Sequence, residues 1–414
     1  MNKIYGCIGE RLKHSFSKEI HNALADYDYR IIEVEREGLG EFATAADFAA
    51  INVTIPYKEM IMPYLYSIDG HAESIGAVNT VVNRDGKLYG YNTDFYGMSR
   101  LLAHAGVNVS GKKVVILGTG GTSKTAYAVL KAEGAREVVR VSRTGREDAV
   151  TYEEMYERHT DAQIVINTTP AGMFPNIFDK AIELDRFPSL VGVIDAVYNP
   201  LRTPMILEAK RRGIAAEGGL YMLVAQAVRA SEIFIDTKYD ERECERVYKR
   251  IVSEKENIVL IGMPASGKST VGKILAKALG RRVIDTDKLI AERAGKDIPT
   301  IFREDGEAKF RELEAEVIRE VASETGVIIA TGGGTVLRSE NMDALRENGR
   351  IYFIDRPLER LMPTDNRPLS STKEDIEKRY HERYKIYTEA ADVRVWANCF
   401  PKAVAEKIMK DFKK

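Results

Sequence analysis

Residues 258–279 have the sequence IVLIGMPASGKSTVGKILAKAL, and this stretch decides the fold of the C-terminal part of the chain. Its centre, Gly262–Thr270, matches the phosphate-binding pattern Gly-x4-Gly-Lys-[Ser/Thr] at every fixed position. An apolar run, Ile258–Ile261, precedes the glycines, and Lys268–Leu279 follows with helical periodicity. A strand, a glycine-rich loop and a helix in this order predict a nucleotide-binding domain built on a parallel sheet.

The loop contains the groups that a nucleoside triphosphate requires. Glycines let backbone N–H groups wrap around phosphates, Lys268 can reach the β- and γ-phosphates, and the Ser269 hydroxyl can hold Mg²⁺. We therefore expect ATP and Mg²⁺ as ligands. The predicted ATP-binding residues are Gly262, Ala265, Ser266, Gly267, Lys268, Ser269 and Thr270.

Composition limits the class of protein. The 414 residues predict two or three domains, and a net charge of −1 gives no electrostatic reason to expect nucleic acid or an anionic membrane as partner. Three cysteines lie far apart in the sequence, which favours a reducing compartment over disulfides or a zinc site. No signal peptide and no apolar run of membrane-spanning length are apparent. We expect a cytoplasmic protein that acts on small molecules, and the sequence leaves the oligomeric state open.

Short apolar runs alternate with helical patterns along most of the chain, which predicts an α/β protein with helices on both faces of parallel sheets. Asn83–Lys87 is typical of a hairpin turn, and the charged segment 236–257 predicts a helix that ends the first part of the chain. The runs expected to be strands are Ile51–Ile55, Val114–Leu117, Val138–Val141, Ile164–Ile166, Val191–Ile194, Ile258–Ile261, Val327–Ala330 and Ile351–Ile354.

A second glycine-rich turn follows the run Val114–Leu117, and a helical pattern, Lys124–Ala132, follows the turn. This order predicts a Rossmann dinucleotide-binding turn, in which the pyrophosphate lies at the N-terminus of the helix. Ser123 stands where the pattern Gly-x-Gly-x-x-Gly has its third glycine. The turn residues predicted to contact the cofactor are Gly118, Thr119, Gly120, Gly121 and Thr122.

The next strand favours NADP over NAD. An NAD site would have an acidic residue at the end of Val138–Val141, but Ser142, Arg143 and Thr144 follow instead. A guanidinium and two hydroxyls suit the 2′-phosphate of NADP. The alternative is that Arg143 is a solvated surface residue.

Several separated motifs carry a family resemblance in the first part of the chain. In order, they are HSFSKEIHN at 14–22, NVTIPYK at 52–58, GAVNT at 76–80, GYNTD at 90–94, NTTPAGM at 167–173, DAVYNP at 195–200 and GLYMLVAQ at 219–226. Residues 1–252 thereby resemble shikimate dehydrogenase. The resemblance implies a substrate domain at about 1–100 and 219–252, a Rossmann domain at about 101–218, and cofactor contacts from Thr168 and Gly219.

The resemblance also implies reduction of 3-dehydroshikimate with NADPH. Lys58 would deliver a proton to the developing alkoxide, and Asp94 would orient Lys58 and the substrate. Hydroxyls would hold the substrate's carboxylate, and amides and a further hydroxyl would hold its ring hydroxyls. The implied substrate residues are Ser15, Ser17, Thr54, Lys58, Asn79, Asn92, Asp94 and Gln226.

A second set of motifs surrounds and follows the phosphate-binding loop. It consists of DTD at 285–287, IPTIF at 298–302, GEAKFR at 306–311 with Glu314, GGG at 332–334, RPL at 367–369 and RYKIY at 383–387. Residues 256–414 thereby resemble shikimate kinase. The resemblance implies a lid that contains Arg367 and phosphorylation of shikimate by ATP with Mg²⁺.

The resemblance gives these residues roles. Asp285 and Asp287, two apart on an expected strand, would point into one cleft, with Asp285 at the metal and Asp287 at the attacking hydroxyl. Arg311 and Arg383 would grip the substrate carboxylate, beside the backbone of Gly332, Gly333 and Gly334. Lys268 and Arg367 would neutralise charge on the phosphoryl group in transit.

The two resemblances describe consecutive steps, so we expect a bifunctional enzyme of the shikimate pathway. Two alternatives stay open. One is a quinate/shikimate dehydrogenase that uses NAD, fused to a small-molecule kinase. The other is a non-catalytic, nucleotide-sensing regulator, against which the retained Lys58, Asp94, Lys268 and Asp287 argue.

Overall fold

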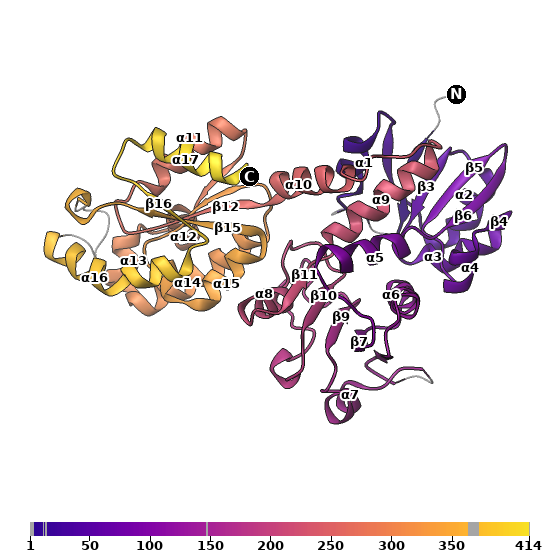
Figure 1. Ribbon diagram of the computed structural model, residues 1–414. Coiled ribbons are helices and arrows are strands. Elements are labelled where there is room, and N and C mark those ends of the chain that lie inside the picture. Colours follow the sequence, from indigo (N-terminus) through magenta and orange to yellow (C-terminus); the bar gives the residue numbers. More distant parts are fainter. Residues whose placement is uncertain (1–3, 11, 13–14, 146–147, 363–371, 414) are drawn as a thin grey trace. The chain divides into compact units, whose positions relative to one another are not determined.

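The computed structural model describes residues 4–10, 12, 15–145, 148–362 and 372–413 (Figure 1). The chain divides into two compact units, Met1–Ile251 and Val252–Lys414, called here the N-terminal and C-terminal units. The described residues form three sheets covered by helices, so the expected α/β class is confirmed. Among these residues no helix is both long enough and apolar enough to cross a membrane.

The N-terminal unit contains two sheets. Its strands are β1 (Tyr5–Gly9), β2 (Tyr29–Glu33), β3 (Ala50–Val53), β4 (Ser67–Ile68), β5 (Thr80–Arg84), β6 (Lys87–Tyr91), β7 (Lys113–Leu117), β8 (Glu137–Val141), β9 (Ile164–Asn167), β10 (Gly192–Asp195) and β11 (Ala215–Glu217). Its helices are α1 (Ser17–Leu24), α2 (Leu39–Ala45), α3 (Tyr57–Met60), α4 (Gly70–Ile75), α5 (Asp94–His104), α6 (Gly121–Ala132), α7 (Tyr152–Arg158), α8 (Pro204–Arg211), α9 (Leu220–Phe234) and α10 (Glu243–Lys255), the last of which crosses the division between the units.

The first sheet has the strand order β2-β1-β3-β5-β6-β4. The expected hairpin is present, because β5 and β6 pair antiparallel around Asp85 and Gly86, both of which have positive φ angles. Helices α5 and α9 pack against each other, and α1 packs on α9 (Figure 1). Lys58 lies on α3, which follows β3, and Asp94 begins α5, which follows β6.

The second sheet is parallel, in the order β11-β10-β9-β7-β8. Every residue of β7, β9 and β10 is buried, as expected for apolar runs that helices cover on both faces. The predicted dinucleotide turn joins β7 to α6, at the carboxyl edge of this sheet.

The C-terminal unit has one parallel sheet, in the order β13-β14-β12-β15-β16. Its strands are β12 (Asn257–Ile261), β13 (Val283–Asp285), β14 (Ile328–Ala330), β15 (Gly349–Asp355) and β16 (Val393–Trp396). Its helices are α11 (Lys268–Leu279), α12 (Thr286–Ala294), α13 (Ile298–Glu304), α14 (Gly306–Ala322), α15 (Ser339–Asn348), α16 (Lys373–Ala390) and α17 (Pro401–Phe412).

One local prediction was wrong. We expected Asp285 and Asp287 on one strand, but β13 ends at Asp285 and α12 begins at Thr286. The Asp285 carboxylate accepts a hydrogen bond from the Lys288 backbone N–H at 3.4 Å and caps the helix, so the chain turns before Asp287. Asp287 therefore reaches the centre of the unit from the first turn of a helix.

Candidate active sites

Lys58 and Asp94 form an ion pair in the N-terminal unit. The Lys58 Nζ lies 2.5 Å from Asp94 Oδ2, and the two side chains are only 15% and 9% exposed. Lys58 lies on α3, and Asp94 is the first residue of α5. A Cβ atom placed on Gly121 would lie 3.6 Å from Lys58 Cδ, so the amine-bearing chain passes directly beside the dinucleotide turn. A cation suited to proton donation is thereby placed next to a predicted cofactor site.

The predicted carboxylate-binding serines lie together at the start of α1. Ser15 Oγ donates to Ser17 Oγ at 3.0 Å and accepts from the Ser17 backbone N–H at 3.2 Å. Tyr198 also forms a hydrogen bond with Ser15, although burial is the main reason that the pKa of Tyr198 is raised to about 12. Tyr198 follows β10 of the second sheet, so it links the two sheets of this unit at the predicted substrate site.

The predicted amide residues have structural partners as well. Asn79 accepts from the Thr93 backbone N–H at 2.7 Å, and Gln226 accepts from the Thr93 hydroxyl at 3.3 Å. Asn92 donates to the Ala77 carbonyl at 2.9 Å and accepts from Phe95 N–H at 3.1 Å, which occupies both ends of its amide. Thr54 is half-buried at the end of β3, before the turn that leads to Lys58.

Thr93 and Tyr198 had no predicted role, although both lie within motifs quoted above. Thr93 is 2% exposed and hydrogen-bonds to both Asn79 and Gln226, which brings those residues together. Its position between Asn92 and Asp94 in GYNTD was the available signal.

The dinucleotide turn has the shape that its glycines predict. Gly118 has φ of 105°, and a Cβ atom there would lie 2.8 Å from Thr168 Oγ1, so another residue would not fit. Thr168 in turn donates to the Leu117 carbonyl at 2.6 Å. Ser123, in place of the third glycine, is fully buried and donates to the Gly118 carbonyl at 2.7 Å, which closes the turn. A Cβ atom on Gly120, the N-cap of α6, would meet no other atom within 4 Å, so there is open space at this helix N-terminus, where a pyrophosphate could bind.

The other predicted cofactor residues surround this edge of the sheet. Ser142 Oγ is buried without a hydrogen-bond partner among the described residues, while Arg143 and Thr144 are exposed after β8. An orphaned hydroxyl beside an accessible guanidinium fits a phosphate-bearing ligand. Gly219, the N-cap of α9, packs so closely on the Ala196 backbone that a side chain would clash.

In the C-terminal unit, the phosphate-binding loop lies between β12 and α11. Gly262, Ala265 and Gly267 have φ angles of 149°, 60° and 94°, which turn successive backbone N–H groups toward the inside of the loop. Lys268 Nζ donates to the Gly262 carbonyl at 2.7 Å. Ser266 Oγ is buried and lacks a partner within the described chain, as a group that serves a bound phosphate would.

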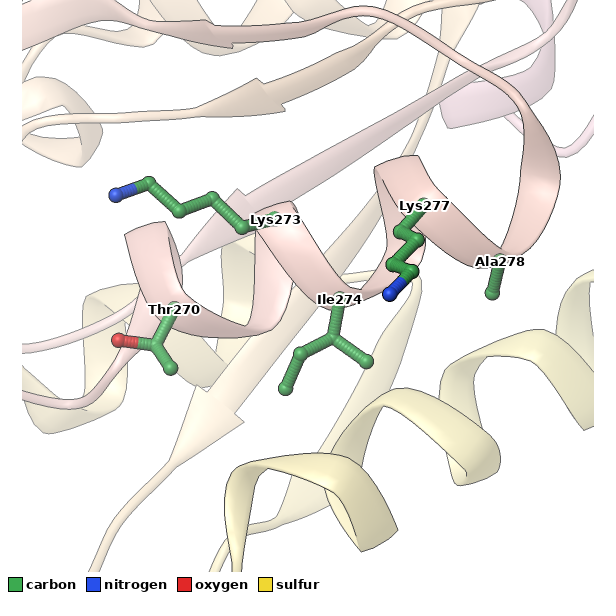
Figure 2. A pocket seen from close by; sticks show the side chains of 5 residues that line it. All are labelled: Thr270, Lys273, Ile274, Lys277 and Ala278. Atoms are coloured by element: carbon green, nitrogen blue, oxygen red, sulfur yellow. The ribbon is translucent and has the colours of Figure 1, made fainter.

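Ser269 and Asp285 meet beside the loop, with Oγ 2.7 Å from Oδ2. Mg²⁺ prefers hard oxygen ligands and usually keeps several waters, so a hydroxyl and a carboxylate at this spacing fit a magnesium site. A surface hollow runs along α11 from the adjacent Thr270 past Lys273 and Lys277 (Figure 2). The residues that line the hollow all lie on α11, and the acidic and arginine side chains described next are not among them.

Two carboxylates converge on Gly332. A Cβ atom on this glycine would lie 2.5 Å from Asp287 Oδ1 and 3.1 Å from Glu314 Oε1, so only glycine leaves both in place. Glu314 is fully buried and accepts from Arg311 Nη1 at 2.7 Å. A side chain on Gly334 would clash with the Arg311 guanidinium. Glu314 had no predicted role, although its spacing of three residues from Arg311 on a helix was a usable signal.

Arg383 lies on the other side of the glycines. Its side chain donates to the Gly333 carbonyl at 3.3 Å, and only 9% of the residue is exposed. Burial lowers the pKa of the Arg383 guanidinium, and the positive charges of Arg379 and Arg311 lower it further, while Tyr387 opposes the shift. The positive charges of Arg379 and Arg311 both act on the Arg383 guanidinium, and such a concentration of positive charge suits an anion. Predicted Arg367 lies outside the described residues.

Comparisons with known proteins agree with both family resemblances. A family model described as the shikimate dehydrogenase substrate binding domain matches residues 7–81, and one for shikimate kinase matches 264–413. A shikimate dehydrogenase (NADP(+)) from Clostridium perfringens is 38% identical over 268 residues, covering 60% of this chain and 98% of the relative. The N-terminal unit belongs to the shikimate dehydrogenase family. The C-terminal unit is a shikimate kinase domain.

Solved structures of the dehydrogenase family agree with this assignment. Shikimate dehydrogenase 1 from Peptoclostridium difficile is 34% identical, with a TM-score of 0.56, and covers 60% of this chain and 97% of its own. A chorismate mutase/shikimate 5-dehydrogenase fusion protein from Clostridium acetobutylicum is 30% identical, with a TM-score of 0.57, and covers 61% and 97%. The chain is thus a shikimate-pathway enzyme that joins an oxidoreductase unit to a kinase unit, and its families imply NADP and ATP as cofactor and co-substrate.

Proposed function

We propose that the dehydrogenase unit reduces 3-dehydroshikimate to shikimate with NADPH, and that the kinase unit then phosphorylates the 3-hydroxyl of shikimate with MgATP. The observation that carries the first step is the Lys58–Asp94 ion pair of 2.5 Å beside Gly121 of the dinucleotide turn. The second step rests on the convergence of Asp287, Glu314 and Arg311 on the glycines that follow β14.

In the reduction, NADPH would supply the hydride that adds to the ketone carbon. The oxygen of that ketone then gains negative charge, and Lys58 is the side chain that would donate a proton to it. Asp94 would hold the Lys58 amine and accept from a ring hydroxyl of the substrate. Ser15 and Ser17 would donate to the substrate carboxylate, because their hydroxyls lie together at the start of α1.

NADP preference would come from the segment after β8. Arg143 is exposed, so its guanidinium could contact the 2′-phosphate of NADP. Ser142 and Thr144, on either side of it in the sequence, would add hydroxyls. Gly118, Gly120 and Gly121 would bring the backbone and the N-terminus of α6 to the pyrophosphate.

In the phosphoryl transfer, Lys268 and the loop N–H groups would hold the β- and γ-phosphates. Mg²⁺ would neutralise phosphate charge, held by Ser269 directly and by Asp285 through water. Arg311 and Arg383 would bind the substrate carboxylate, and Asp287 would orient the attacking hydroxyl or accept its proton. Arg367, from the predicted lid, would add positive charge at the transferred group.

Initial rates with four substrate and cofactor pairs test the first step. Shikimate and quinate are each supplied with NADP⁺ or NAD⁺, and the absorbance of the reduced cofactor is followed. We expect shikimate with NADP⁺ to give the highest kcat/KM. Faster turnover of quinate with NAD⁺ would favour the alternative dehydrogenase, and no turnover of any pair would favour a non-catalytic regulator.

A further inference from the structure

Tyr387 on α16 contacts two groups of the predicted substrate site in the kinase unit. Its side chain is fully buried, and its hydroxyl donates a hydrogen bond to the Gly333 carbonyl. The Arg383 guanidinium donates to the same carbonyl, with Nη1 at 3.3 Å from the oxygen. Tyr387 also forms a hydrogen bond with the Arg383 side chain. The phenol, the guanidinium and the carbonyl therefore contact one another, and the function proposed above gives Tyr387 no part.

The chemistry of these groups decides which of them donates. A carbonyl can only accept a hydrogen bond, and a guanidinium can only donate. The Tyr387 hydroxyl gives its proton to Gly333, so its oxygen accepts from Arg383. Residues 383 and 387 are four apart on α16 and so lie on the same face of the helix. The guanidinium is thereby held by two oxygens, one from the phenol and one from the glycine backbone.

Packing fixes the position of the Tyr387 hydroxyl. The Tyr387 ring stacks on that of Phe353 from β15, with ring centroids 5.2 Å apart and an angle of 11° between the ring planes. Phe353 is itself buried in the main core of the unit. A ring that is stacked within a close-packed core has little room to turn. The hydroxyl therefore stays at the Gly333 carbonyl.

The two arginines predicted to bind the substrate carboxylate are held by different kinds of partner. Arg311 pairs with the carboxylates of two glutamates. Among the described residues Arg383 forms no ion pair, and the neighbouring arginines repel it. An acidic partner would orient Arg383 but would also offset its charge. Tyr387 and the Gly333 carbonyl are neutral, so they orient the guanidinium and leave its charge for an anion.

We infer that Tyr387 is a positioning residue, which holds the Arg383 guanidinium in place for the carboxylate of the kinase substrate. In this way it contributes to the selection of ring acids over uncharged ring alcohols. The inference rests on the proposed kinase function and adds to it a residue that acts through Arg383.

The first test is Tyr387→Phe in the full-length chain, assayed by ADP formation from ATP and shikimate without NADP⁺. The change removes one hydroxyl and keeps the stacked ring. We expect the KM for shikimate to rise about tenfold, with the KM for ATP and kcat within about threefold of the unaltered chain. An unchanged KM for shikimate would overturn the inference alone. If the unaltered chain does not phosphorylate shikimate, the proposed kinase function fails, and this inference fails with it.

Tyr384→Phe is the matched control. The Tyr384 ring packs edge-on against the same Phe353, with centroids 5.9 Å apart, and its hydroxyl donates to Asp355 Oδ2 at 3.1 Å. Within the described part of the chain, this hydroxyl makes no hydrogen bond to Gly333. We expect the control to lower the melting temperature at least as much as Tyr387→Phe does and to leave the KM for shikimate within about twofold. An equal rise of this KM in both variants would show a merely structural role and overturn the inference.

Shikimate methyl ester tests whether the effect depends on the carboxylate. Because the ester lacks the negative charge, the position of the guanidinium should matter less for its binding. We expect Tyr387→Phe to lower kcat/KM about tenfold for shikimate and less than about twofold for the ester. An equal loss with both compounds would contradict the inference.

A double-substitution cycle tests whether Tyr387 acts through Arg383. In an Arg383→Met background, Tyr387→Phe should lower kcat/KM for shikimate by less than about twofold, because the side chain that it positions is already missing. Full additivity of the two changes would refute the proposed role. If Tyr387→Phe folds poorly, Tyr387→Met takes its place, since a flexible methionine can fill the space of the ring. The same rise of the KM for shikimate is expected there, and an unchanged KM would again overturn the inference.

Discussion

The two candidate sites differ in chemistry, although the substrates proposed for them are closely related ring acids. The dehydrogenase site is built mainly from neutral amides and hydroxyls, with one ion pair, Lys58–Asp94, at its centre. The kinase site concentrates charge, with Arg311 held between Glu307 and Glu314 and with Arg383 close by. A reductase must place one proton beside a ketone, whereas a kinase must offset the charges of phosphates and a carboxylate. The contrast therefore follows from the proposed reactions.

The largest expected effect comes from removing the lysine to which we assign a chemical role in each site. We expect Lys268→Ala to lower the kinase kcat/KM by about a thousandfold or more, because the loop loses its charge on the β- and γ-phosphates. Dehydrogenase rates of the same chain should stay within about twofold and serve as the internal control. Retained kinase activity in this variant would break the comparison.

Lys58→Met is the reciprocal change. It keeps the length and much of the apolar stem but removes the proton donor, so we expect the kcat for reduction to fall by about 10²- to 10⁴-fold. Phosphorylation of added shikimate should be unaffected. A small loss, restored fully by raising the substrate concentration, would show that Lys58 only binds substrate.

Substituting two glutamates in turn tests how the kinase site holds Arg311. Glu314 and Glu307 both pair with Arg311, but their side chains are 1% and 51% exposed. Removing a buried charge partner costs more than removing an exposed one. We expect Glu314→Gln to raise the kinase KM for shikimate by about tenfold or more and Glu307→Gln to raise it by less than about threefold. Equal effects would mean that burial does not matter here.

We expect salt to change the KM for shikimate of the two activities to different extents, by a smaller factor than the substitutions above. With nucleotides saturating, raising NaCl from about 50 to 500 mM should increase the KM for shikimate several-fold in the kinase, where arginines would bind the carboxylate. The dehydrogenase KM should change by less than about twofold, because serine hydroxyls would hold the same group. Steady-state titrations of both activities on one preparation would measure this. A larger change in the dehydrogenase would reverse the comparison.

The smallest effect concerns stability. Burial raises the pKa of Glu347 from 4.5 to about 9, with Asp343 adding to the shift. A carboxyl whose pKa is higher when folded favours the folded state below its ordinary pKa and loses that contribution as pH rises toward the folded pKa. We expect Glu347→Gln to match the unaltered chain near pH 5 and to melt a few degrees higher near pH 8. A parallel decline of both proteins with pH would contradict this.

Buried Asp195 in the dehydrogenase unit shows how partners limit such a shift. Burial raises its pKa to about 7 only, because hydrogen bonds from Thr203, the Val197 backbone and Asn167 stabilise the charged form. Glu347 Oε2 has no hydrogen-bond partner among the described residues, and the Glu347 shift is larger. We therefore expect the difference in melting temperature between Asp195→Asn and the unaltered chain to change less from pH 5 to pH 8 than it does for Glu347→Gln.

Sequence predicted most of the fold because its apolar runs are short and well separated. Helix α11 begins and ends where the periodicity predicted it, and β12 starts one residue earlier than expected. Asp287 was misplaced because a capping carboxylate at Asp285 ended the strand, and strand periodicity alone gives no sign of such a cap. Among the site residues, the motifs quoted for the two families contain Thr93, Tyr198 and Glu314. The roles of Thr93 and Tyr198 depend on partners distant in sequence, so spacing could not assign them, whereas the spacing of Glu314 from Arg311 was a usable signal.

The most direct test of the account is a coupled assay on the intact chain. It is supplied with 3-dehydroshikimate, NADPH, ATP and Mg²⁺, and NADPH loss and shikimate 3-phosphate formation are followed together. We predict that both occur, that omission of NADPH abolishes the phosphorylated product, and that omission of ATP leaves NADPH oxidation intact. NADPH consumption without any phosphorylated product would contradict the assignment of the kinase unit, and no NADPH consumption would contradict the account as a whole.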